Sequence, residues 1–135
     1  MKLLGFNFTK ISAEKTSNNF QDLKVGTKID VTEIIEAKQD IIKTKEELLA
    51  VKFTYDIEYS KDIAKMMFQG NLLLGIDSKT FKEVLKQWKG KQMPEEFKIT
   101  LFNIIIRKSS IKALNLEEEL NLPLHIQLPS LRKKE

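Results

Sequence analysis

The sequence contains no cysteine, and this absence excludes several kinds of chemistry at once. Without thiols the chain can form no disulfide, no thiolate zinc site and no cysteine nucleophile. Histidine occurs once, at His125, and neither an HxH nor an HExxH spacing is present, so the sequence offers no metal site. We interpret His125 as a packing or surface residue, and we expect no cofactor.

Glycine is scarce as well. The five glycines stand apart from one another, so the chain has no phosphate-binding loop and no dinucleotide fingerprint. The Ser109-Ser110 pair lacks the G-x-S-x-G pattern of a nucleophilic serine. Acidic runs such as Glu95-Glu96 and Glu117-Glu118-Glu119 lie at turns or predicted helix ends, where capping or solvation explains them. We therefore predict that the chain is not an enzyme.

Long apolar runs are also missing. A membrane-spanning helix needs about 18 consecutive apolar residues. The longest apolar cluster, residues 101–106, is interrupted by Asn103 and stopped by Arg107. Residues 1–8 are too short and too interrupted for a signal peptide. We expect a cytoplasmic protein without direct membrane insertion, and its 135 residues fit a single domain, 1–135.

The positive charge of the chain does not by itself indicate a nucleic-acid partner. The net charge is +4, and the excess is mostly dispersed. Several lysines lie along the first predicted helix, and Trp88 of the same helix could stack on a base. Trp88, however, shares a helical stripe with Phe81, Val84 and Leu85, which is typical of a core-facing side. We therefore interpret Trp88 as a core residue and expect no nucleic-acid partner.

What the sequence does contain is strand-like alternation followed by helix-like periodicity. In residues 49–59, apolar and aromatic residues alternate strictly with small or polar ones, which predicts a half-buried strand of an antiparallel sheet. Similar patterns predict three more strands, at 3–11, 28–35 and about 66–74. Ile41 and Ile42 are expected to extend the second strand or to begin the next. Four strands followed by helices favour an α+β fold, with the sheet and its crossover loop in residues 1–76.

Three details of these strands give further predictions. Leu4, Phe6 and Phe8 are expected on one face of the first strand. Residues 12–27 form a connection that is long for a hairpin, so the strands that it joins need not be neighbours. Gly70 interrupts the apolar side of the last strand, where we expect a bulge or a close backbone approach.

Two helices are predicted within residues 77–121, a short one and a long one. Thr80 and Glu83 have the spacing of a capping box, and Ser78 is an alternative N-cap for the short helix. Gly90 suits its end. Pro94 suits the first turn of the long helix, which continues to about residue 120.

The long helix would extend about 40 Å, more than the width of a small domain. It carries two apolar stripes, and the first, which we expect on the sheet, comprises Phe97, Leu101, Ile104 and Ile105. The second stripe consists of Ile99, Phe102 and Ile106 and needs another partner. A second copy of the chain is the simplest partner, so we predict that Ile99, Phe102 and Ile106 form an oligomer interface.

The remaining residues, 122–135, are predicted to form an extended arm and a tail. In Leu122-Pro123-Leu124-His125-Ile126-Gln127-Leu128-Pro129, apolar residues alternate with polar residues or proline. The two prolines forbid a helix here and favour an extended chain.

With these elements placed, the chain resembles the SecB family of export chaperones. The order of elements is similar from Phe6 to Leu131. Local similarities lie in Phe8-Thr9-Lys10-Ile11-Ser12, in Lys28-Ile29-Asp30-Val31-Thr32 and in Phe68-Gln69-Gly70-Asn71-Leu72-Leu73-Leu74-Gly75-Ile76. A short helix, a long helix begun by proline and an arm rich in leucine and proline complete the resemblance.

The resemblance implies a fold, an assembly and a function. The fold would be a four-stranded antiparallel Greek-key sheet followed by a short helix and a long C-terminal helix, and the assembly a dimer of dimers. The function would be that of an ATP-independent molecular chaperone that holds unfolded client polypeptides in apolar grooves, unaggregated or export-competent. By position, the peptide-binding residues would be Phe20, Leu23, Leu124, Ile126 and Leu128, for which ordinary packing of loop and arm is the alternative.

The sequence departs from the family in its charges, and a second kind of function stays open. Lys52, Asp56 and Glu58 make the polar side of the strongest strand mixed, and the tail contains Arg132-Lys133-Lys134. These features argue against delivery of clients to the SecA motor and leave open general holding or the guarding of one client such as an antitoxin. The alternative function is a monomeric helix-grip-like carrier that encloses a small apolar ligand between sheet and helix.

Overall fold

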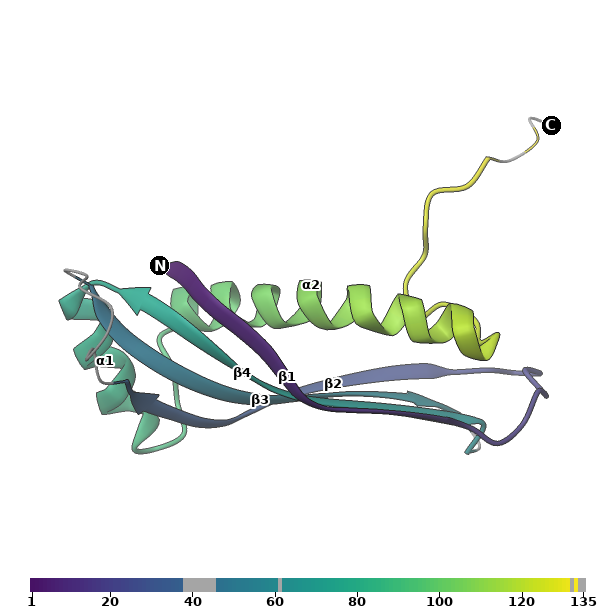
Figure 1. The fold of residues 1–135 in the computed structure, drawn as a ribbon, viewed down its shortest axis with the longest axis horizontal. Coiled ribbons are helices and arrows are strands. Elements are labelled where there is room, and N and C mark those ends of the chain that lie inside the picture. The colour runs from purple at the N-terminus through teal and green to yellow at the C-terminus, as the bar shows by residue number, and fades with distance from the viewer. Residues whose placement is uncertain (38–45, 61, 132, 134–135) are drawn as a thin grey trace.

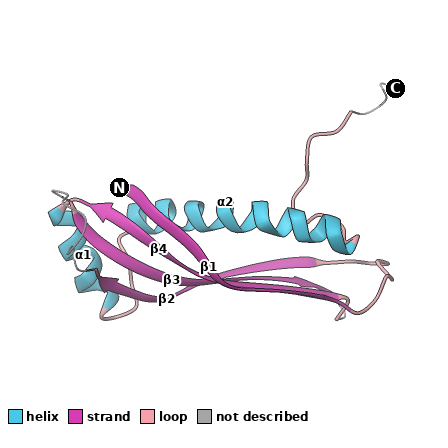
Figure 2. Ribbon diagram, viewed as in Figure 1, coloured by secondary structure: helices cyan, strands magenta, loops and turns pink. Residues whose placement is uncertain are grey.

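The computed structural model describes residues 1–37, 46–60, 62–131 and 133 as a sheet with one long helix lying along one of its faces (Figure 1). The elements, in chain order, are β1 (Lys2–Lys15), β2 (Val25–Glu36), β3 (Glu47–Tyr59), β4 (Ala64–Ile76), α1 (Ser78–Trp88) and α2 (Glu95–Leu120). Figure 2 shows α1 at one end of the sheet and α2 running toward the other. The arm leaves the C-terminal end of α2 and points away from the sheet (Figure 1). The predicted α+β class is confirmed.

The strand order is β1-β4-β3-β2, and every neighbouring pair is antiparallel. Strands β2, β3 and β4 follow one another as a meander, and β1 pairs with β4 at the far edge. Residues 16–24 must therefore cross from one edge of the sheet to the other, which explains their length and gives a Greek key. Ile41 and Ile42, expected near the ends of β2 and β3, lie outside the described residues, as do Arg132 and Lys134 of the tail.

The alternation predicted for β3 is the basis of the core. Its odd-numbered residues from Leu49 to Tyr59 are buried beneath α2, and they pack beside the buried even-numbered residues of β4. Phe97, Leu101 and Ile105 of α2 close this core from above. On the opposite face, Lys52 pairs with Glu33 at 3.2 Å, while Glu58 lies 3.8 Å from Lys65. The charged side chains of Lys52 and Glu58 thus form ion pairs with residues of the neighbouring strands.

Strand β1 departs from simple alternation because its register with β4 shifts twice, between Leu3 and Gly5 and between Phe8 and Lys10. Phe6 and Phe8 lie on the core face, with ring centroids 5.4 Å and 6.4 Å from that of Phe53. Leu4 falls at the first shift and contacts the side of Gly75 that is opposite to the core. The expectation that Leu4 shares the face of Phe6 and Phe8 is therefore wrong, because an extra residue in a strand reverses the alternation.

The start of α1 differs from the predicted capping box. Asp77 is the N-cap, and its carboxylate accepts hydrogen bonds from the backbone N–H of Thr80 at 3.0 Å and from the Thr80 hydroxyl at 2.7 Å. These bonds hold the pKa of Asp77 below its ordinary value. Thr80 is thus a donor within the first turn, and neither Thr80 nor Ser78 is the cap. None of the helices in the described part of the chain is long and apolar enough to cross a membrane.

Gly70 provides a test of the core packing. A Cβ atom added at Gly70 would lie 2.7 Å from a ring carbon of Phe53 and 2.7 Å from the carbonyl oxygen of Asn7. We expect Gly70→Ala to lower the free energy of unfolding by about 1–3 kcal/mol, because both neighbours belong to the packed sheet. Gly26→Ala is the matched control, since nothing lies within 4 Å of its added Cβ. Urea unfolding followed by Trp88 fluorescence measures both, and equal stabilities would contradict this packing.

Candidate functional site

The predicted peptide-binding residues of the crossover loop, Phe20 and Leu23, lie in a segment that is tied to the sheet at both ends. Thr16 N–H donates to the Ile63 carbonyl at 2.8 Å, and Lys24 N–H donates to Ser60 Oγ at 2.9 Å, so both ends of the loop are tied to the turn between β3 and β4. Phe20 and Leu23 are partly buried against the hydrophobic core. Partial burial is compatible with ordinary packing and with a client contact, so the peptide-binding role of Phe20 and Leu23 stays a prediction.

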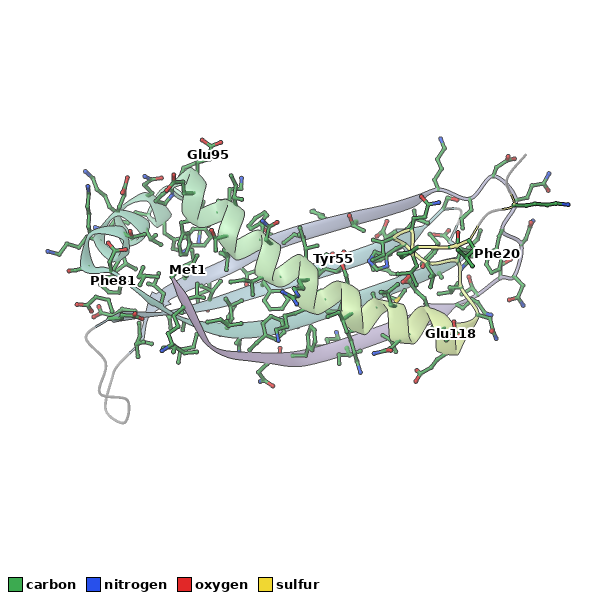
Figure 3. The ribbon with its side chains drawn as sticks, turned by 90° about the horizontal axis from the view of Figure 1, so that it is seen from above. Met1, Phe20, Tyr55, Phe81, Glu95 and Glu118 are labelled. Atoms are coloured by element: carbon green, nitrogen blue, oxygen red, sulfur yellow. The ribbon has the colours of Figure 1, made fainter. Side chains whose placement is uncertain are left out.

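The predicted peptide-binding residues of the arm are more exposed to solvent. Leu124, Ile126 and Leu128 are 38%, 42% and 49% exposed, although all three are large apolar side chains. They belong to the arm, which leaves the C-terminal end of α2 (Figure 1). The arm begins at the end of the molecule that carries the crossover loop, where Figure 3 labels Phe20 and Glu118. The arm thus presents an apolar surface beside a packed loop.

A buried polar network fixes the base of this arm. Glu117 of α2 is completely buried, and His125 of the arm has a side chain that is 1% exposed. The Nδ1 atom of His125 lies 2.6 Å from Glu117 Oε1, and the backbone N–H of His125 donates to Glu117 Oε2 at 2.8 Å. The Tyr59 hydroxyl lies 2.7 Å from Glu117 Oε2 and 2.7 Å from the carbonyl oxygen of Pro123. One carboxylate therefore joins β3, α2 and the arm.

The network has the order of groups found in a hydrolase triad. Glu117 contacts the Nδ1 atom of His125, and the Nε2 atom lies 3.3 Å from Ser110 Oγ. Ser110, however, is buried in the middle of α2. A nucleophilic serine must reach a substrate carbonyl and an oxyanion site. Ser110 is only 7% exposed, and each of these groups contacts another across two elements, so we interpret them as a structural anchor.

The sequence interpretation of Glu117 and His125 was incomplete. Glu117 is not a solvated residue of a helix end, and His125 is more than a packing residue, because each satisfies the other inside the protein. A signal was present in the spacing, since the buried residues Phe97, Leu101, Ile105, Ser109, Ala113 and Glu117 recur every four positions. Continuing this row toward the end of α2 would have placed Glu117 on the core side.

The second apolar stripe of α2 borders a groove that the sequence did not reveal. Ile99 and Ile106 are 55% and 40% exposed, and Phe102 between them is partly buried. Beside Phe102 lie two adjoining hollows of about 530 and 550 Å³ that share Met93, Lys98 and Phe102. We call them the α2–β2 groove, lined by Ile29, Asp30, Val31, Thr32, Trp88, Lys91, Met93, Glu95, Lys98, Ile99, Phe102 and Asn103.

Trp88 has two roles in this structure. It packs partly against the core, as its stripe predicts, and it also lines the α2–β2 groove. The Nζ atom of Lys91 lies 4.5 Å from the centre of the Trp88 ring, and that of Lys98 lies 5.5 Å from the Phe102 ring. In the described residues no group of three or more histidine or acidic side chains is placed to hold a metal ion.

The anchor predicts a specific dependence of stability on pH. Burial, with the adjacent Glu117 carboxylate as the second cause, raises the pKa of Tyr59 well above its ordinary value of 10.0. The folded protein keeps this proton longer than the unfolded chain, so the stabilisation is complete below about pH 10 and is lost as the pH rises further. Tyr59→Phe should lower the free energy of unfolding at about pH 8 by roughly 1–3 kcal/mol, because Glu117 loses a donor.

The same variant should weaken the loss of stability at alkaline pH. For each protein, urea unfolding at about pH 8 and about pH 11 gives the decrease in the free energy of unfolding. Lysine deprotonation contributes to this decrease in both proteins, so it cancels in the comparison. The remaining tyrosine, Tyr55, retains its own raised pKa, caused mainly by burial, so part of the decrease persists. An identical decrease in the wild type and in Tyr59→Phe would show that the Tyr59 hydroxyl is not buried on Glu117.

Comparison with known proteins supports the fold. No protein-family model matches the sequence, and no curated protein matches it. Among solved structures, the chain is similar to the SecB-like chaperone Rv1957 of Mycobacterium tuberculosis, in complex with a ChAD peptide from the Rv1956 HigA1 antitoxin. The two chains are 14% identical with a TM-score of 0.56, over 99% of this chain and 92% of that one. The chain therefore has the α+β fold of a SecB-like chaperone, as the resemblance in sequence implied.

Proposed function

We propose that this protein is a molecular chaperone that binds non-native polypeptides on apolar surfaces and does so without ATP. The observation that carries the proposal is the exposure of Leu124, Ile126 and Leu128 on an arm that the buried Glu117–His125 pair holds to α2. An exposed apolar row on a fixed segment can bind an unfolded chain without first becoming ordered, which lowers the entropic cost of binding. The similar Rv1957 structure contains a bound peptide, which supports a polypeptide as the occupant.

The binding energy in this proposal comes from apolar area alone. Burial of apolar surface contributes about 25 cal/mol per Å² before entropic costs. Folded proteins hide such segments, so the preference would be for unfolded clients. Each arm would bind a client only weakly by itself, and several arms on one oligomer would add avidity. Clients would be kept unaggregated or export-competent in the cytoplasm, and the mixed charges of β3 argue against the SecA motor as a delivery partner.

The structure offers less support for a carrier of a small apolar ligand. Such a carrier needs an enclosed cavity between the sheet and α2. In this chain that space is filled by the buried residues of β3 and β4 together with Phe97, Leu101 and Ile105. The hollows of the α2–β2 groove lie on the outer side of Phe102. Surface binding of an extended chain fits this arrangement better.

Suppression of aggregation tests the proposed function. We expect the protein, in molar excess, to reduce light scattering from a thermally aggregating client. Replacing Leu124, Ile126 and Leu128 together by serine should weaken client binding on the order of 100-fold, at about 1 kcal/mol for each lost contact. The matched control is a triple serine variant of Ile11, Ile35 and Ile111, which are also exposed. No suppression by the wild type, or equal suppression by both variants, would refute the role of the arm.

Oligomerisation is a separate prediction of the proposal. We expect a dimer of dimers in which the stripe of Ile99, Phe102 and Ile106 packs against a second copy. Ile106→Glu should lower the mass measured by light scattering after gel filtration, because a buried unpaired carboxylate is unfavourable. Ile111→Glu is the control, since Ile111 is 56% exposed and lies outside the stripe. A monomeric wild type, or an unchanged mass for Ile106→Glu with normal circular dichroism, would contradict this interface.

A further inference from the structure

The positive charge of the chain is concentrated on α1 and the turn that follows it. Residues 78–91 contain five lysines and one acidic residue, Glu83. The rest of the chain contains 18 basic and 18 acidic residues, so this segment alone accounts for the net charge of +4. The excess is therefore more local than the composition indicates, and α1 carries it at one end of the sheet (Figure 2).

Four of these lysines lie on one side of α1. They are spaced by three, four and three residues, which places them in one row over about 15 Å of the helix axis. All four are exposed, and none forms an ion pair with a described residue. The side of α1 that faces the core carries the buried residues Phe81 and Val84 instead. We call the exposed side the lysine face, which consists of Lys79, Lys82, Lys86 and Lys89.

The acidic groups near α1 gather on a different flank of the helix. Glu83 is the only acidic residue within α1, and its carboxylate accepts a hydrogen bond from Gln87 at 3.4 Å. Glu83 lines a hollow together with Asp77 and Glu96, and no described residue of the lysine face lines that hollow. Glu95 lines the α2–β2 groove. These carboxylates therefore leave the charge of the lysine face largely uncompensated.

The stability of α1 does not explain this placement of charge. Lys79 lies in the first turn, where a positive charge opposes the helix dipole, and that turn contains no acidic residue. Like charges three or four residues apart on a helix also repel one another. The lysine face therefore destabilises α1 slightly, and a bound polyanion would relieve the repulsion.

From these observations we infer that the lysine face binds the phosphate backbone of single-stranded nucleic acid. Lysines bind this polyanion through counterion release, without apolar contacts. A protein interface needs a buried apolar centre, and a membrane anchor needs an inserted apolar group, but none of the large exposed apolar side chains belongs to α1. A duplex would bring its second strand toward Asp77 and Glu83, so the narrow lysine face fits one strand.

This inference goes beyond the proposed function and does not rest on it. It also reverses the expectation of no nucleic-acid partner, because that expectation relied on a dispersed positive charge. Trp88 keeps its predicted place toward the core and supplies no stacking surface here. The contacts are therefore to phosphates alone and should not depend on base sequence.

The salt dependence of binding to a dye-labelled oligouridylate of about 12 nucleotides tests this inference. Fluorescence anisotropy gives the affinity at about 50 mM and about 200 mM salt. Four phosphate contacts predict a slope of about −2.8 for log K against log salt, which is about 50-fold weaker binding at the higher concentration. An oligothymidylate of the same length should bind with the same affinity, because RNA and DNA share the phosphates.

Neutralisation of two lysines identifies the residues responsible. Lys79→Gln/Lys82→Gln should reduce the slope to about −1.4 and should leave α1 folded, because the loss of Lys79 removes an unfavourable charge from its first turn. Lys10→Gln/Lys28→Gln is the matched control, since both lysines are exposed on the sheet and the net charge changes equally. The control should keep the slope of the wild type, and circular dichroism checks that both variants fold.

Three results would overturn the inference. The first is an absence of oligouridylate binding at about 50 mM salt, and the second is an equal slope for the two double variants. The third is tighter binding of a polyglutamate with the same number of charges, or of a duplex of the same length, because the preferred ligand would then be of another kind. The triple serine variant of the arm should bind oligouridylate like the wild type, which separates this site from the proposed client surface.

Discussion

The buried carboxylate of Glu117 is the constraint on which the arrangement of this protein depends. A carboxylate removed from water is strongly destabilising unless hydrogen-bond donors surround it. Here the donors come from two other parts of the chain, the Tyr59 hydroxyl of β3 and the backbone and ring of His125. The sheet, the long helix and the start of the arm must therefore adopt one relative position. Loss of any partner leaves a buried charge that the remaining contacts do not satisfy.

This anchor explains why the apolar side chains of the arm stay exposed and do not pack onto the rest of the domain. The arm is held at His125, so its apolar neighbours Leu124 and Ile126 stay accessible. At the other end of α2, the turn that carries Lys91 and the edge of β2 leave a groove open beside Phe102. Both surfaces expose apolar side chains next to the packed core. Such surfaces suit the capture of extended polypeptide better than the enclosure of a small ligand, and they support the chaperone proposal on a SecB-like fold.

The main elements of the fold could be predicted because their signals are local. The alternation of residues 49–59 defined β3. The long connection predicted for residues 12–27, which spans 16–24 in the structure, agreed with a crossover between the two edges. The shifts of β1 could not be predicted, since an inserted residue changes the register without changing composition. The N-cap at Asp77 was missed because neighbouring Ser78 and Thr80 are also suitable caps, and only the geometry of the turn decides among them.

The candidate site was harder to predict than the fold. The arm residues Leu124, Ile126 and Leu128 are exposed as a client surface requires, whereas Phe20 and Leu23 pack on the core. Glu117 and His125 escaped detection because hydropathy places charged residues outside, and only the pairing of two such residues makes burial favourable. The α2–β2 groove combines residues from β2, the α1–α2 turn and α2, which no single stretch of sequence brings together.

The central claim is that non-native polypeptide binds on the arm, while the sheet and α2 that hold the arm keep their arrangement. Hydrogen–deuterium exchange with and without a permanently unfolded client tests it most directly. The account predicts slower exchange in the arm beyond His125 when client is present. The amides of β3, and that of His125 on Glu117, should be protected in both states. Exchange in the arm that is unchanged by the client, or a His125 amide as fast as an exposed one, would contradict the account.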